Sequence, residues 1–479
     1  MNYSWARCFF LVIVCLSLLA CEQPKPLPNI LFIAVDDLKP LLGAYGDTSV
    51  ISPNIDRIAS EGVVFLNNHC QQALCGPTRA SLLTGLYPDQ IQVWGFKRQI
   101  REVSFPVVTI PQYFKEQGYH TVGISKIFDY RNVDSGKDSI SWSEPHFPNS
   151  ADPIEPYFPE ATGPVVGYFY QSLLAKSKWD SLRQNDPKTT SSPDGYLHKI
   201  IKPACEALDL PDHAYKDGIF ALRAIEDLKR LSQGNQPFFL AVGFERPHLP
   251  YTAPKRYWDL YNRDEIQLAD YQQRAIDDLD FAYTNSGSIK SYTDEEGNFI
   301  YRKLGDGALL TDHEQRKLIH GYKASVSYID VQVGKIIQQL EELQLRDHTI
   351  VVIWGDHGYH MYDHSIWGKS TNFEQATRSP LIITGGGISP RKIQVATEFT
   401  DLFPTLCELA GLDAPDHLSG ESLVDLMRGK RDVVKGYAIS QFQRGDLMGY
   451  AIRDDRFRYV EWVQEGRHVN ALSQLDQVV

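Results

Sequence analysis

Positive charge is scarce in this sequence. Its 479 residues include 48 Lys and Arg but 60 Asp and Glu, which gives a formal net charge of −12 at pH 7. Proteins that bind nucleic acid present an excess of basic side chains, so this balance argues against nucleic acid as a partner. An anionic substrate would have to be bound by a local group of cations, because the overall field of the protein repels it.

Internal repeats, low-complexity segments and paired cysteines are also lacking. A hydrophobic content of 43% and a charged content of 23% are ordinary for a globular protein. The length predicts one large α/β domain with a smaller one. Of the seven cysteines, two lie in an apolar N-terminal segment, and Cys21 and Cys75 are assigned separate roles below. The remaining three do not make a disulfide framework.

The N-terminus holds a continuous apolar run. Residues 8–20 read CFFLVIVCLSLLA and follow Arg7. The run is shorter than the roughly 20 residues of a membrane-spanning helix and has the length of a signal-peptide core. It ends with Ala20 directly before Cys21, which resembles a bacterial lipobox, where the cysteine carries lipid and becomes the mature N-terminus. An ordinary secretory signal is the alternative.

We therefore expect a lipoprotein signal peptide at residues 1–20 and a short tether at 21–28, which reads CEQPKPLP. Both alternatives predict export. With lipid on Cys21, the protein would be anchored to a membrane in the periplasm or at the cell surface of a bacterium.

Three apolar runs predict buried strands, and helical patterns accompany them. The runs are NILFIAVDD at 29–37, PFFLAVGFERPH at 237–248 and TIVVIWGDHG at 349–358. Apolar residues at helical spacing predict helices over 217–232 and 323–343. This alternation predicts a doubly wound α/β sheet flanked by helices.

Each of these runs ends in side chains that can bind or catalyse. In doubly wound sheets, ligands bind beyond the carboxyl ends of the strands, so groups far apart in the sequence meet at one edge. The groups at the three strand ends are Asp36 and Asp37, Arg246 and His248, and Asp356 and His357.

Cys75 lies in a C-x-P-x-R pattern that begins a predicted helix. Pro77 fits the first helical turn, and Gly85 ends the helix. At a helix N-terminus the backbone amides and the dipole favour an anion. An unmodified thiol there would have a lowered pKa and could act as a nucleophile.

The stretch CGPTRASLLTG, residues 75–85, resembles the signature of the type I sulfatases of the alkaline-phosphatase-like superfamily. In that family the cysteine is oxidised to formylglycine. The likeness is greatest to the iduronate-2-sulfatase branch. It extends in order through ILFIAVDDLKPLLGAYGD, AVGFERPHLPY and WGDHGYHMYDHSIWGKSTNFEQATRSPLI, over roughly residues 29 to 425.

The resemblance implies a large mixed sheet flanked by helices as the catalytic domain, residues 29–430. A small, shortened C-terminal α+β subdomain would occupy 431–479. It also implies hydrolysis of a sulfate ester on a sulfated sugar or polysaccharide. One oxygen of the hydrated aldehyde attacks sulfur and the alcohol leaves; the second hydroxyl then expels sulfate and restores the aldehyde. A formylglycine-generating enzyme or maturase would be a partner.

The same resemblance assigns the site residues. The expected Ca²⁺ ligands are Asp36, Asp37, Cys75, Asp356 and His357. Besides Cys75 as formylglycine, the expected catalytic residues are Arg79, Lys126, His248 and Lys369. Arg79 would orient the nucleophile and neutralise charge. The other three would bind sulfate or protonate the leaving alcohol.

One position departs from the family pattern inside the site. SKIFDY has Asp129 where the family has a histidine that assists residue 75. An aspartate can accept a proton, but it adds negative charge close to an anionic substrate. Asp129 is therefore a further candidate for a catalytic role.

Two other functions remain open from the sequence. The first is a phosphatase or phosphonate-ester hydrolase of the same superfamily. The second is a lipoprotein that binds sulfated glycans without catalysis, which Asp129 and the shortened C-terminal subdomain motivate.

Overall fold

The computed structural model describes the chain in segments. They are residues 26–103, 105–147, 181, 184–185, 202–275, 279–283, 287–294, 300 and 310–464. The expected signal peptide, the expected lipid-attachment residue Cys21 and most of the expected tether lie outside the described residues. Within the described segments, no helix combines the length and the apolar character that a bilayer crossing requires.

A seven-stranded mixed sheet forms the centre of the protein, with strand order β12-β2-β11-β8-β1-β6-β4. Its strands are β1 (Asn29–Val35), β2 (Val63–Phe65), β4 (His120–Ser125), β6 (Phe238–Phe244), β8 (Thr349–Gly355), β11 (Leu381–Thr384) and β12 (Arg391–Ile393). β1 is parallel to both β6 and β8, whereas β11 is antiparallel to β8 and β2. This confirms the predicted fold class.

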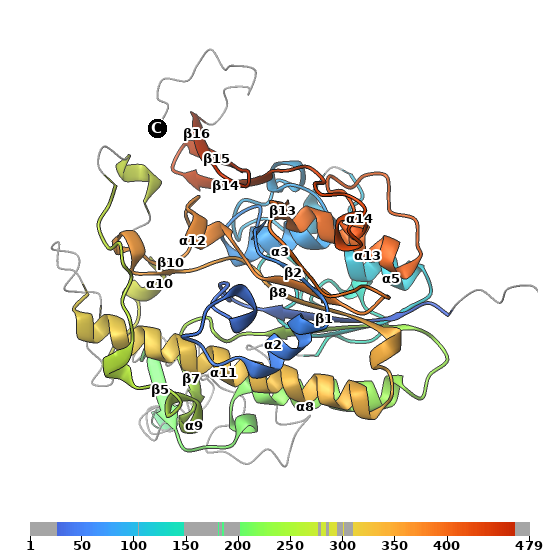
Figure 1. Cartoon of the computed structure of the whole chain (residues 1–479), viewed down its shortest axis with the longest axis horizontal. Coiled ribbons are helices and arrows are strands. Elements are labelled where there is room, and N and C mark those ends of the chain that lie inside the picture. The colour runs from blue at the N-terminus through green and yellow to red at the C-terminus, as the bar shows by residue number, and fades with distance from the viewer. Residues whose placement is uncertain are drawn as a thin grey trace, which may run out of the picture.

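Helices cover both faces of this sheet (Figure 1). One layer contains α2 (Pro53–Ser60), α8 (Lys216–Leu231) and α11 (Asp312–Glu342). The other contains α3 (Cys75–Thr84), α5 (Ile110–Glu116), α13 (Leu402–Ala410) and α14 (Val424–Met427).

The side chains of β1 show why the strand is apolar from Ile30 to Val35. Leu31 and Ile33 belong to the hydrophobic core beneath α2, α8 and α11, whereas Ile30 and Phe32 belong to the core beneath α3, α5 and α13. Successive residues of a strand point to opposite faces, so a strand covered on both faces needs apolar residues at every position.

Helix α11 begins earlier than the apolar pattern predicted. We expected a helix over 323–343, but it starts at Asp312, where Thr311 and Glu314 form a capping box. The first turns are polar on the outside, so the periodic apolar pattern is weak there although the cap fixes the start. α8 lies within a residue of the expected 217–232.

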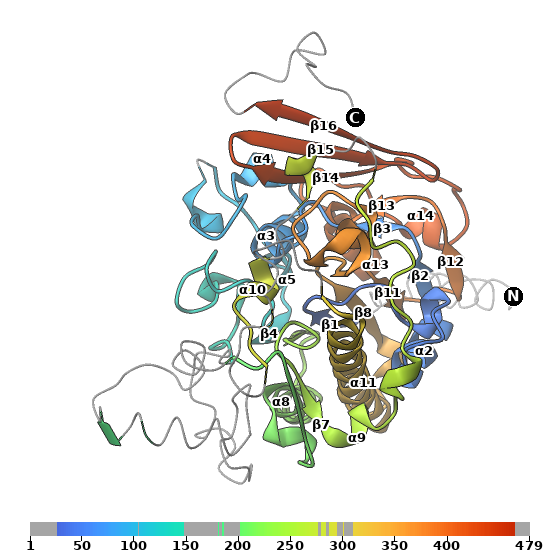
Figure 2. The ribbon, with the colours of Figure 1, turned by 90° about the vertical axis from the view of Figure 1, so that its left-hand side faces the viewer.

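A separate three-stranded antiparallel sheet follows near the end of the described chain: β14 (Ala438–Arg444), β15 (Leu447–Arg453) and β16 (Arg458–Gln464). It lies above α3 and the loop before it (Figure 2). The amide of Gln441 donates to the carbonyl of Gln71 at 2.7 Å, which joins β14 to the segment that leads into Cys75.

The remaining strands and short helices lie in the connections. They are β3 (Asn68–His69), β5 (Cys205–Leu208), β7 (Tyr251–Pro254), β9 (His360–Met361), β10 (Trp367–Gly368), β13 (Thr397–Glu398), α4 (Pro88–Ile91), α9 (Lys255–Trp258), α10 (Gly287–Lys290) and α12 (Glu374–Thr377).

Candidate active site

The acidic residues at two strand ends lie side by side. In the parallel pairing of β1 with β8, Val35 is opposite Gly355, so the next residues, Asp36 and Asp356, leave the sheet together. The amide of Asp37 donates to Oδ1 of Asp356 at 2.9 Å. The sheet therefore brings together two acidic segments that are more than 300 residues apart in the sequence.

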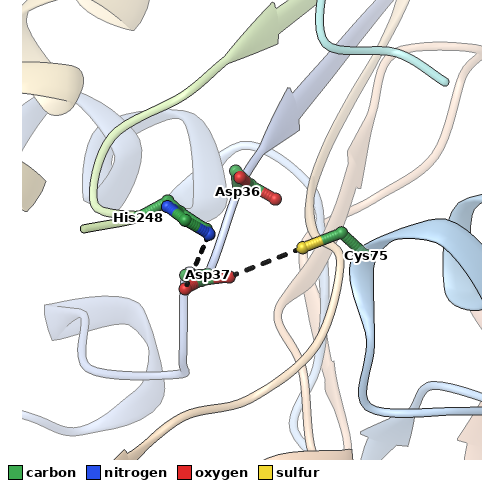
Figure 3. Close-up of side chains that lie close together, drawn as sticks. All are labelled: Asp36, Asp37, Cys75 and His248. Carbon is green, nitrogen blue, oxygen red and sulfur yellow. Dashed lines mark hydrogen bonds and ion pairs between the residues drawn. The ribbon is translucent and has the colours of Figure 1, made fainter. Parts of the chain in front are cut away.

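Cys75 is the first residue of α3 and faces these acids (Figure 3). Its Sγ lies 3.8 Å from Oδ1 of Asp37 and 3.5 Å from Nε2 of His357, and Nζ of Lys369 donates to it at 3.0 Å. All ten residues of α3 are buried, so the helix crosses the core and delivers its N-terminus to the site.

Arg79, one turn further along α3, links the acidic residues. Its Nε donates to Asp356 at 3.1 Å and its Nη2 to Asp36 at 3.3 Å. Its Nη1 donates to the carbonyls of Lys126 and Ile127. Arg79 is 0% exposed, so it neutralises the carboxylates and fixes the turn that carries Lys126.

Two lysines complete the ring of charges around Cys75. Lys126 follows β4 and forms an ion pair with Asp36, while Lys369 follows β10 and forms one with Asp37. Burial alone would lower the pKa of each amine, but the neighbouring carboxylates raise it above its ordinary value. Both lysines are therefore positively charged at neutral pH.

His248 approaches from the segment after β6. Its Nε2 lies 3.9 Å from Oδ2 of Asp37, and its Nδ1 lies 2.6 Å from the carbonyl of Leu249. A carbonyl only accepts, so Nδ1 carries the proton and Nε2 faces the site. Burial lowers the pKa of His248 to about 4, so the ring is neutral at pH 7. Arg246 donates to the carbonyl of His248 and so supports this turn.

The turn after β1 holds Asp37 in an unusual backbone conformation. Its φ of 59° lies in the left-handed region, which costs energy for a residue with a side chain. The hydroxyl of Tyr322 on α11 donates to the carbonyl of Asp37 at 2.8 Å. The hydroxyl also accepts from the amide of Lys39 at 2.9 Å. The sequence analysis missed Tyr322, because a tyrosine inside an amphipathic helix carries no signal of this role.

A second residue that fixes the acids lies within the C-x-P-x-R motif. The hydroxyl of Thr78, in the first turn of α3, donates to the backbone carbonyl of Asp356 at 2.8 Å. This contact ties α3 directly to the end of β8. It therefore fixes the position of Cys75 relative to Asp356.

The expected metal ligands fall into two overlapping groups, each close enough together to hold a cation. Within each of these two overlapping sets, the ligand atoms all lie within 4.8 Å of one another. These sets are Asp36, Asp37, Cys75 and His248, and Asp37, Cys75, Asp356 and His357. Three carboxylates offer hard oxygen ligands, which fit Ca²⁺ or Mg²⁺ better than a soft metal. His357 turns its Nε2 toward Asp37 and Asp356, at 3.3 and 3.5 Å.

Carboxyl pKa values at this site move in opposite directions. Burial alone would raise the pKa of Asp36, but Lys126 and the other nearby cations hold it well below its usual range. The pKa of Asp356 is raised, mainly by burial and also by repulsion from Asp36. Asp356 is therefore the least readily ionised of the three carboxyls, and a divalent cation bound beside it would favour its ionised form.

The predicted low pKa of the Cys75 thiol is wrong. Burial raises its pKa well above the ordinary value, and the charge of Asp36 adds to this effect. The helix N-terminus does not overcome the loss of hydration for a fully buried thiol. An unmodified Cys75 is therefore a poor thiolate nucleophile.

The structure brings all the expected ligand and catalytic residues to one edge of the sheet, but Asp129 is engaged elsewhere. Its buried carboxylate accepts from Arg131 through Nε at 2.8 Å and Nη2 at 2.7 Å. Sequence reasoning singled out Asp129 and missed its partner two residues later.

The fold and site together describe a hydrolase of anionic esters, and solved structures share the fold. A phosphonate monoester hydrolase from Silicibacter pomeroyi has a TM-score of 0.66 at 22% identity, covering 91% of this chain and 87% of its own. A protein solved in complex with its substrate, D-glucosamine-2-N,6-O-disulfate, has a TM-score of 0.63 at 19% identity, covering 92% of this chain and 90% of its own.

A sequence model of the sulfatase family matches residues 28–412, and the chain belongs to this family. Human iduronate 2-sulfatase is 32% identical over 499 aligned residues, which cover 91% of this chain and 85% of the human protein. The chain is therefore a sulfuric ester hydrolase, and the predicted resemblance is confirmed.

Proposed function

We propose that this chain hydrolyses a sulfate ester carried by a sulfated saccharide, with formylglycine at position 75 as nucleophile and Ca²⁺ as its cation. The observation that carries the proposal is the meeting of Cys75 with three carboxylates and two charged lysines at one edge of the sheet. The saccharide class follows the names of relatives, among them iduronate 2-sulfatase.

The chain's own residues account for binding and orientation. Lys126 and Lys369 are charged, lie beside residue 75 and can each donate to a sulfate oxygen. Arg79 is too buried to reach a substrate and holds Asp36 and Asp356 in place. His248 is 34% exposed and turns the unprotonated Nε2 of its neutral ring into the site, where it can accept a hydrogen bond or a proton from a substrate hydroxyl.

Asp36, Asp37, Asp356 and His357 would hold the cation together with residue 75. A bound divalent cation supplies positive charge that stabilises the negative charge of the reacting sulfate group. Because burial raises the pKa of the Cys75 thiol, the unmodified residue is a weak nucleophile, and a nucleophile formed by modifying it agrees better with this site. A formylglycine-generating enzyme or maturase would perform the oxidation.

Export to the periplasm or cell surface with lipid on Cys21 is part of the same proposal. It rests on the apolar N-terminal run and its Ala20–Cys21 junction. Metabolic labelling with a fatty-acid analogue tests it: wild type should be labelled, and Cys21→Ser should not.

Paired substrates test the reaction class. Protein co-expressed with a maturase should hydrolyse 4-nitrophenyl sulfate faster than 4-nitrophenyl phosphate or a phenylphosphonate ester. Mass spectrometry of the peptide around position 75 should show an aldehyde in place of the thiol. Faster phosphate or phosphonate hydrolysis would support the alternative suggested by the phosphonate hydrolase of like fold.

A matched cysteine pair tests the nucleophile. Cys75→Ala should abolish turnover without unfolding the protein. Cys70→Ala, which removes another buried thiol five residues earlier, should remain active, because the Cys70 thiol makes only weak contacts, with the carbonyl of Ala376 at 3.9 Å and with the Thr78 side chain. Wild-type activity in both variants would show that residue 75 is not the nucleophile.

A further inference from the structure

Asp129 and Arg131 form a fixed pair after the turn that carries Lys126. The Asp129 carboxylate is fully buried and accepts from the Arg131 side chain through two nitrogens. It also accepts from the Arg131 backbone amide at 3.1 Å. Three hydrogen bonds to one carboxylate make a rigid support, so Asp129 is occupied in holding Arg131.

Phe96 lies between this guanidinium and the first turn of α3. The Arg131 guanidinium carbon lies 3.2 Å from the centroid of Phe96 and 5.4 Å from that of Tyr130. Phe96 lies against Gly76, because a Cβ on Gly76 would be 3.0 Å from the Phe96 ring. One ring therefore separates Arg131 from the residue that follows Cys75.

The exposed fraction of the cationic side chains increases from Arg79, which is fully buried, to Arg131. The side chains of Arg79, Lys369, Lys126 and Arg131 are 0%, 4%, 17% and 36% exposed. Arg131 is thus the outermost of these cations. Among the described residues, its Nη1 has no hydrogen-bond partner, while Nε and Nη2 are both occupied by Asp129.

We propose that Arg131 is a specificity-determining residue that binds a second anionic group of the saccharide, next to the sulfate that is hydrolysed. The proposal rests on the proposed function. Lys126 and Lys369 pair with the acids around Cys75 and would bind the reacting sulfate. A stacked, partly exposed guanidinium with a free N–H at the mouth fits the oxygens of a carboxylate or another sulfate. The Asp129–Arg131 pair thus replaces the family histidine with a substrate contact.

Substrate pairs that differ by one anion test this proposal. The set is a hexose monosulfate, the uronic acid sulfated at the same hydroxyl, and the hexose carrying a second sulfate. Wild type should prefer one or both of the doubly anionic sugars in kcat/KM. Arg131→Gln should reduce that preference about tenfold to a hundredfold, the effect of losing a hydrogen bond to a charged group.

Three further variants separate binding from structural damage. Arg131→Lys keeps the charge and should retain part of the preference. Asp129→Asn weakens the support for Arg131 and should also reduce the preference. Arg98→Gln removes a nearby charge from the loop that carries Phe96, where Arg98 donates to Gln92 and Glu102, and it should leave the ratio of kcat/KM values as in wild type.

The outcomes distinguish this proposal from the proposed function. No hydrolysis of 4-nitrophenyl sulfate or of any sugar in the set would refute the proposed function. Sulfatase activity without preference for a doubly anionic sugar would overturn the role of Arg131. An equal loss on all three sugars in Arg131→Gln would overturn it too. The uronic acid and the disulfate separate a carboxylate from a sulfate as the second group.

Discussion

Replacing Arg79 with methionine should destabilise the protein strongly, and the structure sets the size of the effect. Arg79 is fully buried and bonds Asp356 at 3.1 Å and Asp36 at 3.3 Å. Methionine has similar length but no charge. Breaking a buried ion pair by removing one partner costs about 3–5 kcal/mol. Asp36 keeps Lys126 as a partner, so the loss corresponds to one broken pair, that of Asp356, rather than two.

Urea denaturation of wild type and Arg79→Met gives the measurement. Both should be measured with a chelator present, because a divalent cation could neutralise Asp356 and hide the loss. The free energy of unfolding should fall by about 3–5 kcal/mol. The matched control is Arg57→Met, whose ion pairs with Glu61 and Glu341 are exposed and should contribute at most about 1 kcal/mol.

A loss below about 1 kcal/mol in Arg79→Met would refute this reasoning, since that is the range of a surface ion pair. It would mean that water or rearrangement hydrates Asp356 once the guanidinium is gone. A large loss that disappears when Ca²⁺ is added would instead agree with a cation held by the same carboxylate.

Three other outcomes are expected. Burial would raise the pKa of Glu374, but nearby positive charge, including Arg458, holds it at about 2, below the ordinary 4.5. Its ion pairs therefore stabilise the protein above pH 4.5 and are lost as pH falls through 2. The difference in Tm between wild type and Glu374→Gln should narrow from pH 7 to pH 3.5; a constant difference contradicts the pKa. Lys435→Met should cost about 3 kcal/mol, because it leaves the buried Glu398 and Asp401 without their cation; urea denaturation measures it, and a neutral effect would show that other donors suffice. Finally, a chelator should abolish sulfatase activity and added Ca²⁺ should restore it, whereas full activity in the chelator would exclude a required cation.

Asp129 illustrates what a motif can and cannot predict. The comparison of motifs identified a carboxylate where the family has histidine, and its chemistry alone suggested proton transfer or a loss of activity. The structure pairs it with Arg131, which itself stacks on Phe96. Phe96 and Arg131 are more than 30 residues apart in the sequence. Their contact arises from tertiary packing, so no local pattern could have predicted it.

The sequence by itself determined three strands of the central sheet, β1, β6 and β8, and the residues that follow them. After their first residues, β1 and β8 are apolar because both faces of the sheet are covered, and polar groups begin where each strand ends. The C-x-P-x-R pattern likewise predicted a helix start at Cys75, because proline suits the first turn.

Only the tertiary structure decided how these groups act on one another. Distances, burial and charge balance depend on several elements at once: Tyr322 of α11 fixes Asp37, Arg79 of α3 joins Asp36 to Asp356, and burial raises the pKa of Cys75. Hydration and Coulomb energies depend on three-dimensional surroundings, and the sequence order does not specify these.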